Sequence, residues 1–208
     1  MKRRIVEAKV CSFALAACLS DEKSFGRSAV YEPGYPNPIQ VSMPANAPSI
    51  TQQFRAADPY PDPRWGEHFG IDVHAPIGTP VIAAAGGRVI ESFWEPAYGN
   101  RVLIQHPTDA SGIPPTTRYV HLKTRTVEKG EYVQRGQQIG ELGTTGLLSS
   151  GFPHLHMEVT YGGYSLKLSG KDPHLFWVDG VGRVTCFEPK HRGLPSDPFK
   201  ITYPVLCK

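Results

Sequence analysis

The sequence predicts a mainly β domain, a sheet or barrel built from short strands. Between Ile50 and Tyr161, strand-length runs of apolar and β-branched residues recur at close spacing and are separated by glycine or proline. The chain's 21 glycines and 20 prolines supply many turns, and no long helical pattern stands out. With 208 residues, 40% of them hydrophobic, the chain is long enough for one globular domain with extensions.

The candidate strands follow one another with little between them except turns. Two segments, 78–90 (GTPVIAAAGGRVI) and 130–142 (GEYVQRGQQIGEL), are loosely alike, which hints at a folded-over sheet of duplicated hairpins. The candidate strands are Gly70–Val73, Thr79–Ala83, Gly87–Phe93, Arg101–Gln105, Thr117–Leu122, Tyr132–Val133, Gln138–Leu142 and His154–Thr160.

The N-terminus is typical of an exported protein. A basic start, MKRRIVEAK, precedes a short apolar stretch that ends in Leu15-Ala16-Ala17-Cys18, which resembles the lipobox of bacterial lipoproteins. The alternative is an ordinary buried N-terminal helix, and Glu7 and Lys9 do shorten the apolar core. We therefore predict a signal peptide with lipobox over 1–18, acylation of Cys18, and an envelope or periplasmic location.

Three further segments complete the predicted organisation. Residues 19–48 are rich in proline and polar residues and predict an extended tether with little to pack. Residues 49–163 hold the candidate strands. Residues 164–208 contain aromatics and two cysteines without clear periodicity, and predict an extension that wraps over the core.

Charge and cysteine usage agree with export. Removing residues 1–17 deletes Lys2, Arg3, Arg4 and Lys9 but only Glu7, so the formal net charge of +3 falls to zero. The basic character thus belongs to the targeting segment and gives no support to nucleic-acid binding. Once Cys11 is removed and Cys18 acylated, Cys186 and Cys207 remain, an even pair that predicts a disulfide.

Three histidine motifs predict a metal site. His68 and Asp72 stand four apart in HFGID, and His154 and His156 share one face of a strand because side chains alternate along it. A catalytic zinc needs three protein ligands and an open fourth position. His68, Asp72 and one member of the HLH pair could supply the three, leaving the other member and His121 of RYVHL to handle protons. No HExxH motif is present.

These motifs, with YGNRVLIQH and VEKGEYVQRGQQIGELGTTG, make the stretch from Ser49 to Tyr161 resemble the lysostaphin-like (LytM-type) zinc endopeptidases. The resemblance implies an antiparallel β core of the duplicated hybrid, barrel-sandwich-like type over 49–163. It implies Zn²⁺ as cofactor, His68, Asp72 and His156 as its ligands, and His121 and His154 as catalytic histidines. The loop LLSSGF before HLH is longer than the family's usual small-residue turn.

The implied activity is hydrolysis of stem or cross-link peptides in peptidoglycan. His121 would act as general base and His154 would donate to the oxyanion. Tyr98 and Asn100 could line the cleft, although a hairpin turn is the more ordinary explanation of YGN. His74 and His106 are expected to be structural or surface residues, and His174 and His191 belong to no motif. Two alternatives stay open: a catalytically silent regulator that activates a cell-wall amidase, and a carrier domain of similar hairpin architecture.

Overall fold

The computed structural model describes residues 39–55, 66–162 and 169–208. The signal peptide, the lipobox cysteine and residues 19–38 of the predicted tether lie outside the described residues. Within those ranges, no helix is long and apolar enough to cross a membrane.

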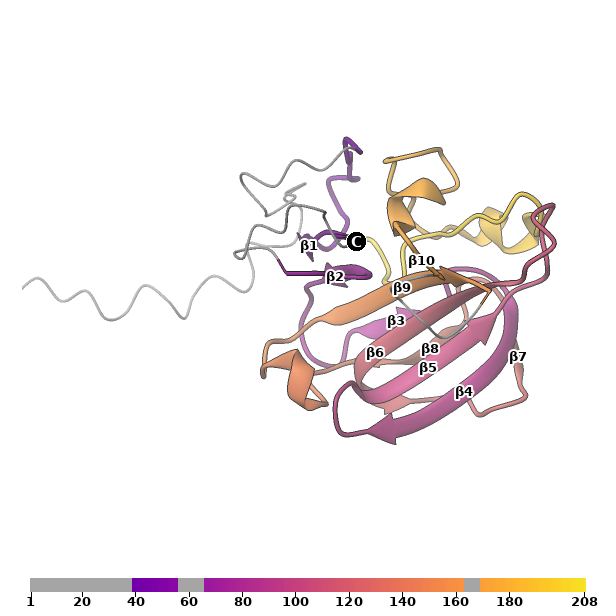
Figure 1. The fold of residues 1–208 in the computed structure, drawn as a ribbon. Coiled ribbons are helices and arrows are strands. Elements are labelled where there is room, and N and C mark those ends of the chain that lie inside the picture. The colour runs from indigo at the N-terminus through magenta and orange to yellow at the C-terminus, as the bar shows by residue number, and fades with distance from the viewer. Residues whose placement is uncertain (1–38, 56–65, 163–168) are drawn as a thin grey trace, which may run out of the picture.

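A mainly antiparallel β-sheet organises the molecule, which confirms the predicted fold class (Figure 1). The strands follow the order β1-β2-β9-β6-β5-β4-β7, while β10 pairs with β9, and β8 pairs with β3 and β6. Short 3₁₀ turns occur at η1 (Leu147–Ser149), η2 (Pro173–Leu175) and η3 (Pro189–Gly193). The strands are β1 (Ile50–Gln52), β2 (Ile71–Val73), β3 (Pro80–Ile82), β4 (Gly87–Glu95), β5 (Gly99–Gln105), β6 (Pro115–Arg125), β7 (Tyr132–Val133), β8 (Gln138–Leu142), β9 (Leu155–Tyr161) and β10 (Gly170–Lys171).

The two similar segments pair with each other. The first contains β3 and the start of β4, and the second contains β7 and β8. Strand β3 pairs with β8, and β4 pairs with β7, both antiparallel. Each of the two similar segments therefore supplies the strands that pair with the other, and these pairings fold the sheet over on itself.

One hydrophobic core fills the space inside the folded sheet. In β2, β5 and β9 its members occupy alternate positions, because every second side chain of a strand points to the same face. The hydroxyl of buried Tyr119 accepts a hydrogen bond from the Ala84 N–H at 2.8 Å. The fully buried large side chains are Trp177, Tyr119, Tyr203, Ile50, Ile71, Ile104, Leu122, Ile139, Leu142, Leu155, Met157 and Ile201.

The C-terminal extension contributes to that core. Trp177, Ile201 and Tyr203 are fully buried, and Trp177 and Ile201 form a parallel bridge with each other. A disulfide joins Cys186 to Cys207, whose Cα atoms lie 5.9 Å apart. In Figure 1 the yellow end of the chain reaches the neighbourhood of β1.

The tether prediction is wrong for residues 39–48. Ala47 is fully buried, Val41 and Met43 pack against the core, and Ser42 pairs with Arg183 of the extension. The Asn46 carbonyl accepts a hydrogen bond from the Lys208 N–H. A proline-rich segment can be ordered when a distant part of the chain supplies its partners, and the local composition contains no sign of this.

Candidate metal centre and its cleft

The three predicted ligands come from two paired strands and the turn before them. Asp72 of β2 lies directly opposite His156 of β9 in the antiparallel register. His68 precedes β2 and pairs through its backbone with Arg55. Gly70 permits this close approach, because a Cβ there would lie 2.5 Å from the Met157 carbonyl oxygen and 2.9 Å from the His156 ring.

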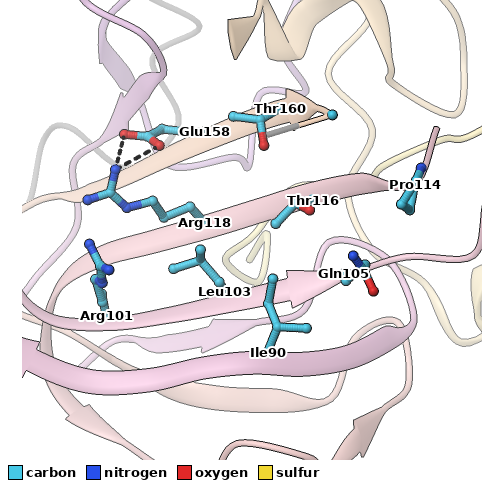
Figure 2. Close-up of a pocket in the computed structure, with 10 residues that line it drawn as sticks. Ile90, Arg101, Leu103, Gln105, Pro114, Thr116, Arg118, Glu158 and Thr160 are labelled. Atoms are coloured by element: carbon cyan, nitrogen blue, oxygen red, sulfur yellow. Dashed lines mark hydrogen bonds and ion pairs between the residues drawn. The ribbon is translucent and has the colours of Figure 1, made fainter. Parts of the chain in front are cut away.

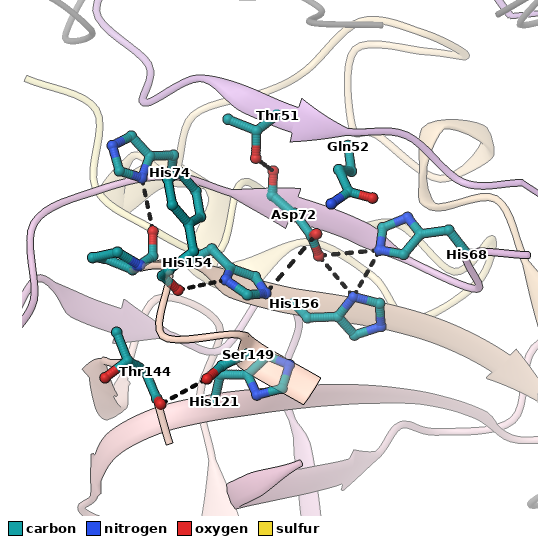
Figure 3. A network of polar contacts seen from close by, with 12 residues as sticks. Thr51, Gln52, His68, Asp72, His74, His121, Thr144, Ser149, His154 and His156 are labelled. Carbon is teal, nitrogen blue, oxygen red and sulfur yellow. Dashed lines mark hydrogen bonds and ion pairs between the residues drawn. The ribbon is translucent and has the colours of Figure 1, made fainter. Parts of the chain in front are cut away.

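Their donor atoms converge on one point (Figure 3). Asp72 Oδ1 lies 2.7 Å from His156 Nδ1 and 3.1 Å from His68 Nε2, and those two nitrogens are 3.0 Å apart. Two ligands of a tetrahedral zinc with bonds of about 2.0–2.1 Å are separated by roughly 3.3 Å. The set is therefore slightly tighter than a zinc site but has its shape.

Hydrogen bonds behind the two rings determine which nitrogens face the centre. His68 Nδ1 donates to the Gln53 carbonyl at 2.7 Å, and His156 Nε2 donates to Glu158 Oε1 at 3.0 Å. In the neutral rings the opposite nitrogens then carry lone pairs toward Asp72. Three electron-pair donors facing one another need a cation between them, so these residues fit a zinc ion.

The charges around the centre agree with this conclusion. Burial opposes ionisation of Asp72, yet hydrogen bonds from His156 and His68 hold its pKa well below the ordinary value. Burial likewise disfavours a charged His156, but Asp72 and Glu158 outweigh it and raise the pKa of that ring to about 9. In the metal-free protein a proton therefore occupies the place that a metal would take at Nδ1.

The two predicted catalytic histidines lie beside the donor set. Their ring centroids are 4.8 Å apart, and the His121 centroid is 6.3 Å from that of His156. His121 Nδ1 donates to the Thr145 carbonyl and His154 Nδ1 to the Phe152 carbonyl, each at 2.8 Å. Both rings therefore leave Nε2 for the cleft. Burial lowers the pKa of His121 to about 4 and also lowers that of His154, which Asp72 partly opposes.

His121 has an unusual backbone. Its φ of 62° lies in the left-handed region, which costs a residue other than glycine roughly 1–3 kcal/mol. The His121 N–H donates to the Tyr98 carbonyl at 3.0 Å, and the pairing of β6 shifts register near this point. The irregular backbone turns the imidazole into the cleft.

A cleft of about 420 Å³ surrounds these groups. Tyr98 lines it, and so do Leu148, Ser149 and Phe152 of the long loop before β9. Asn100, predicted as a second cleft residue, is not among the lining residues. Its amide donates to the carbonyls of Leu122 and Lys123, so it joins β5 to β6.

The remaining histidines lie outside the donor set. His106 is buried and bonded to the Gly86 carbonyl and the Thr117 hydroxyl. His74 donates to the Pro153 carbonyl and stacks on Phe152. His191 is buried in the extension, and His174 is fully buried there against Trp177.

A series of ion pairs behind His156, called here the ion-pair ladder, was not predicted from the sequence. Buried Glu158, which accepts from His156, pairs with Arg118 at 3.2 Å (Figure 2). The guanidinium carbon of Arg118 lies over the Tyr98 ring, 4.1 Å from its centroid. Arg118 Nη2 is also 3.6 Å from Glu95 Oε1, which pairs with Arg101 as well. Figure 2 shows Glu158, Arg118 and Arg101 of this ladder on neighbouring strands, beside a second hollow of about 330 Å³. The alternation in HLHMEV already placed Glu158 on the face of the two histidines.

Comparisons with known proteins agree with the geometry. The family model described as Peptidase family M23 matches residues 66–168. Peptidoglycan DD-endopeptidase ShyC of Vibrio cholerae is 43% identical over 96 residues, 46% of this chain and 21% of the relative. Lysostaphin of Staphylococcus simulans is 36% identical over 113 residues, 53% of this chain and 21% of the relative.

The match to one solved structure covers most of that structure's chain. The catalytic domain of lysostaphin from Staphylococcus simulans shares 33% identity, with 59% of this chain and 88% of that chain covered and a TM-score of 0.48. The chain spans about a fifth of the length of the curated relatives named above. The matched segment contains all three donors and both neighbouring histidines. This chain belongs to peptidase family M23.

Proposed function

We propose that this chain is a zinc metalloendopeptidase that hydrolyses peptide bonds in the stem or cross-link peptides of peptidoglycan. One observation carries the proposal: Nε2 of His68 and Nδ1 of His156 converge with the Asp72 carboxylate, beside two histidines that present Nε2 to the same cleft. The substrate class rests on similarity to relatives named as peptidoglycan endopeptidases.

His68, Asp72 and His156 would hold the ion. Bound there, zinc would polarise the scissile carbonyl and lower the pKa of a water to near neutrality. His121 would accept the proton of the attacking water at Nε2, because its Nδ1–H is committed to the Thr145 carbonyl. Its low pKa keeps this nitrogen unprotonated at neutral pH.

His154 would stabilise the negative charge that develops on the carbonyl oxygen. That role needs a proton on Nε2. Burial lowers the pKa of His154, and Asp72, whose Oδ2 lies 3.9 Å from this nitrogen, partly opposes that shift and so helps the ring to hold the proton. Tyr98 forms the wall of the cleft near His121, with ring centroids 6.2 Å apart.

Digestion of purified peptidoglycan tests the proposal. The zinc-loaded chain should release fragments whose masses show cleaved peptide bonds and intact glycan strands, and a chelator should stop the release. A loaded chain that releases nothing but stimulates a cell-wall amidase would favour the silent regulator. The same mass spectra identify the bond that is cut.

We also propose that the mature protein starts at acylated Cys18 and is anchored in the cell envelope. The motif Leu15-Ala16-Ala17-Cys18 after a basic start supports this. Metabolic labelling with a palmitate analogue should mark the wild type and leave Cys18→Ala unmarked. Equal labelling of both proteins would contradict the anchor.

A further inference from the structure

A buried row of hydrogen bonds connects the C-terminal extension to the candidate ligand His68. Trp177 Nε1 donates to His174 Nδ1 at 2.9 Å, and His174 Nε2 lies 2.5 Å from Gln53 Oε1. The backbone carbonyl of the same Gln53 accepts from His68 Nδ1 at 2.7 Å. The row thus joins residues more than a hundred positions apart in sequence.

The direction of each bond follows from chemistry. An indole N–H only donates, so His174 must accept at Nδ1 and carry its proton on Nε2. That proton requires an acceptor, which orients the Gln53 amide with its oxygen toward His174. Burial lowers the pKa of His174 to about 4, so the ring is neutral at pH 7 and keeps this tautomer.

Burial makes the row rigid. Trp177 and His174 are fully enclosed, and Gln53 is 1% exposed. In a buried site, a polar group that loses its partner is costly to leave unpaired, so the Gln53 side chain is held through its Oε1 and the Gln53 backbone through its carbonyl. The extension is itself fastened by the Trp177–Ile201 bridge and the Cys186–Cys207 disulfide.

We propose that Gln53 and His174 are positioning residues for the metal ligand His68. They hold the Gln53 carbonyl where it takes the Nδ1 proton of His68, which keeps the Nε2 lone pair toward the metal. All three members of the row lie outside residues 66–168, the segment that the family model matches. The inference rests on the metal site of the proposed function and assigns part of that site's support to the flanking segments of this chain.

A purely structural role makes a different prediction. His68 and Arg55 also exchange backbone hydrogen bonds, at 2.7 and 2.9 Å, which could place the Gln53 carbonyl without any side chain. In that case His174 would only fill volume, and any side chain of similar size and good packing would serve.

Zinc affinity of the full chain, measured by competition with a chromophoric chelator, separates the two roles. His174→Phe fills the space without a donor and should weaken zinc binding 10–100-fold, the usual effect of losing a partner behind a metal-binding histidine. His174→Gln restores one donor and one acceptor and should bind within about threefold of the wild type. His191→Phe, at another buried histidine of the extension, is the matched control and should bind like the wild type.

Gln53→Met, which keeps the length and loses the acceptor, gives the answer if His174→Phe does not fold. Wild-type affinity in His174→Phe or Gln53→Met would overturn the inference, as would His174→Gln binding as weakly as His174→Phe. A wild type that binds no zinc contradicts the metal site of the proposed function instead. Loss of affinity in a chain that never cleaves peptidoglycan would sustain the positioning role and refute the proposed activity.

Discussion

His156 and His68 both contact Asp72 Oδ1, yet the groups behind their rings differ in kind. His156 donates to the carboxylate of Glu158, which is paired with Arg118 in a ladder of ions across the sheet. His68 donates to the neutral carbonyl of Gln53, which belongs to a row of uncharged hydrogen-bonding groups. One ligand is supported by charge and the other by neutral dipoles.

This difference shows which parts of the chain support each metal ligand. The ionic support lies within the segment that the family model matches, on strands that the sheet itself fixes. The neutral support comes from the two flanking segments, which must fold against each other before it exists. A carboxylate makes the ring it contacts a stronger donor, whereas a carbonyl mainly sets the orientation of its ring. We therefore expect the losses on the two sides to differ in pH dependence.

The largest effect should come from the ligands themselves. Asp72→Ala, His68→Ala and His156→Ala each leave two protein ligands where a catalytic zinc needs three, so each should lose most bound metal and all activity. Elemental analysis after dialysis, with peptidoglycan turnover on the same samples, measures both. Full zinc occupancy in any of these variants would remove that residue from the ligand set.

The next effect concerns the histidines beside the ion. His121→Ala and His154→Ala should keep near-stoichiometric zinc and lose roughly 10²–10⁴ in rate, the range of general acid–base and oxyanion contributions. The same zinc analysis with single-turnover rates checks this. If His154→Ala empties the site while His156→Ala stays loaded, the two members of the HLH pair have exchanged roles.

Much of this centre could be predicted from the sequence. The strand alternation in HLH and the HxxxD spacing depend on local geometry, and the structure brings those residues together. The left-handed backbone of His121 coincides with a register shift between β5 and β6, which no local pattern shows. The contact between Gln53 and His174 could not be predicted, because it depends on how the C-terminal extension packs against residues 39–55. Packing of residues 39–48 was missed for the same reason.

Removing the ionic support should have a smaller effect than removing a ligand. Glu158→Leu leaves the His156 Nε2–H without its acceptor and Arg118 without its buried partner, and should weaken zinc binding 10–100-fold. Glu158→Gln keeps an acceptor and should bind more tightly than the leucine variant. Glu141→Gln is the matched control: it breaks the surface ion pair between Glu141 of β8 and Lys123 of β6, and it should leave zinc affinity unchanged. Equal affinity of wild type and Glu158→Leu would end the comparison between the two sides.

The smallest effect should be on folding stability, and it should appear only in acid. The neutral support needs an uncharged His174, whose pKa falls from 6.5 to about 4 in the folded chain. Between those values the unfolded chain binds a proton that the folded chain does not, so folding stability should be lost as the pH falls from 6.5 toward 4.

Protonation of His174 in the unfolded chain accounts for up to roughly 2.7 kcal/mol of that loss at pH 4.5, at 1.36 kcal/mol per pH unit below 6.5. Buried His106 and His121, each with a pKa of about 4, act in the same direction, and Asp172, whose pKa burial raises to about 6, acts in the opposite one. None of these three side chains is replaced in His174→Gln, so urea unfolding of the metal-free wild type and variant at pH 7 and 4.5 isolates His174. The variant should lose less stability in acid than the wild type. Equal losses would mean that His174 already carries its charge in the folded chain, and the support behind His68 would then be ionic like that behind His156.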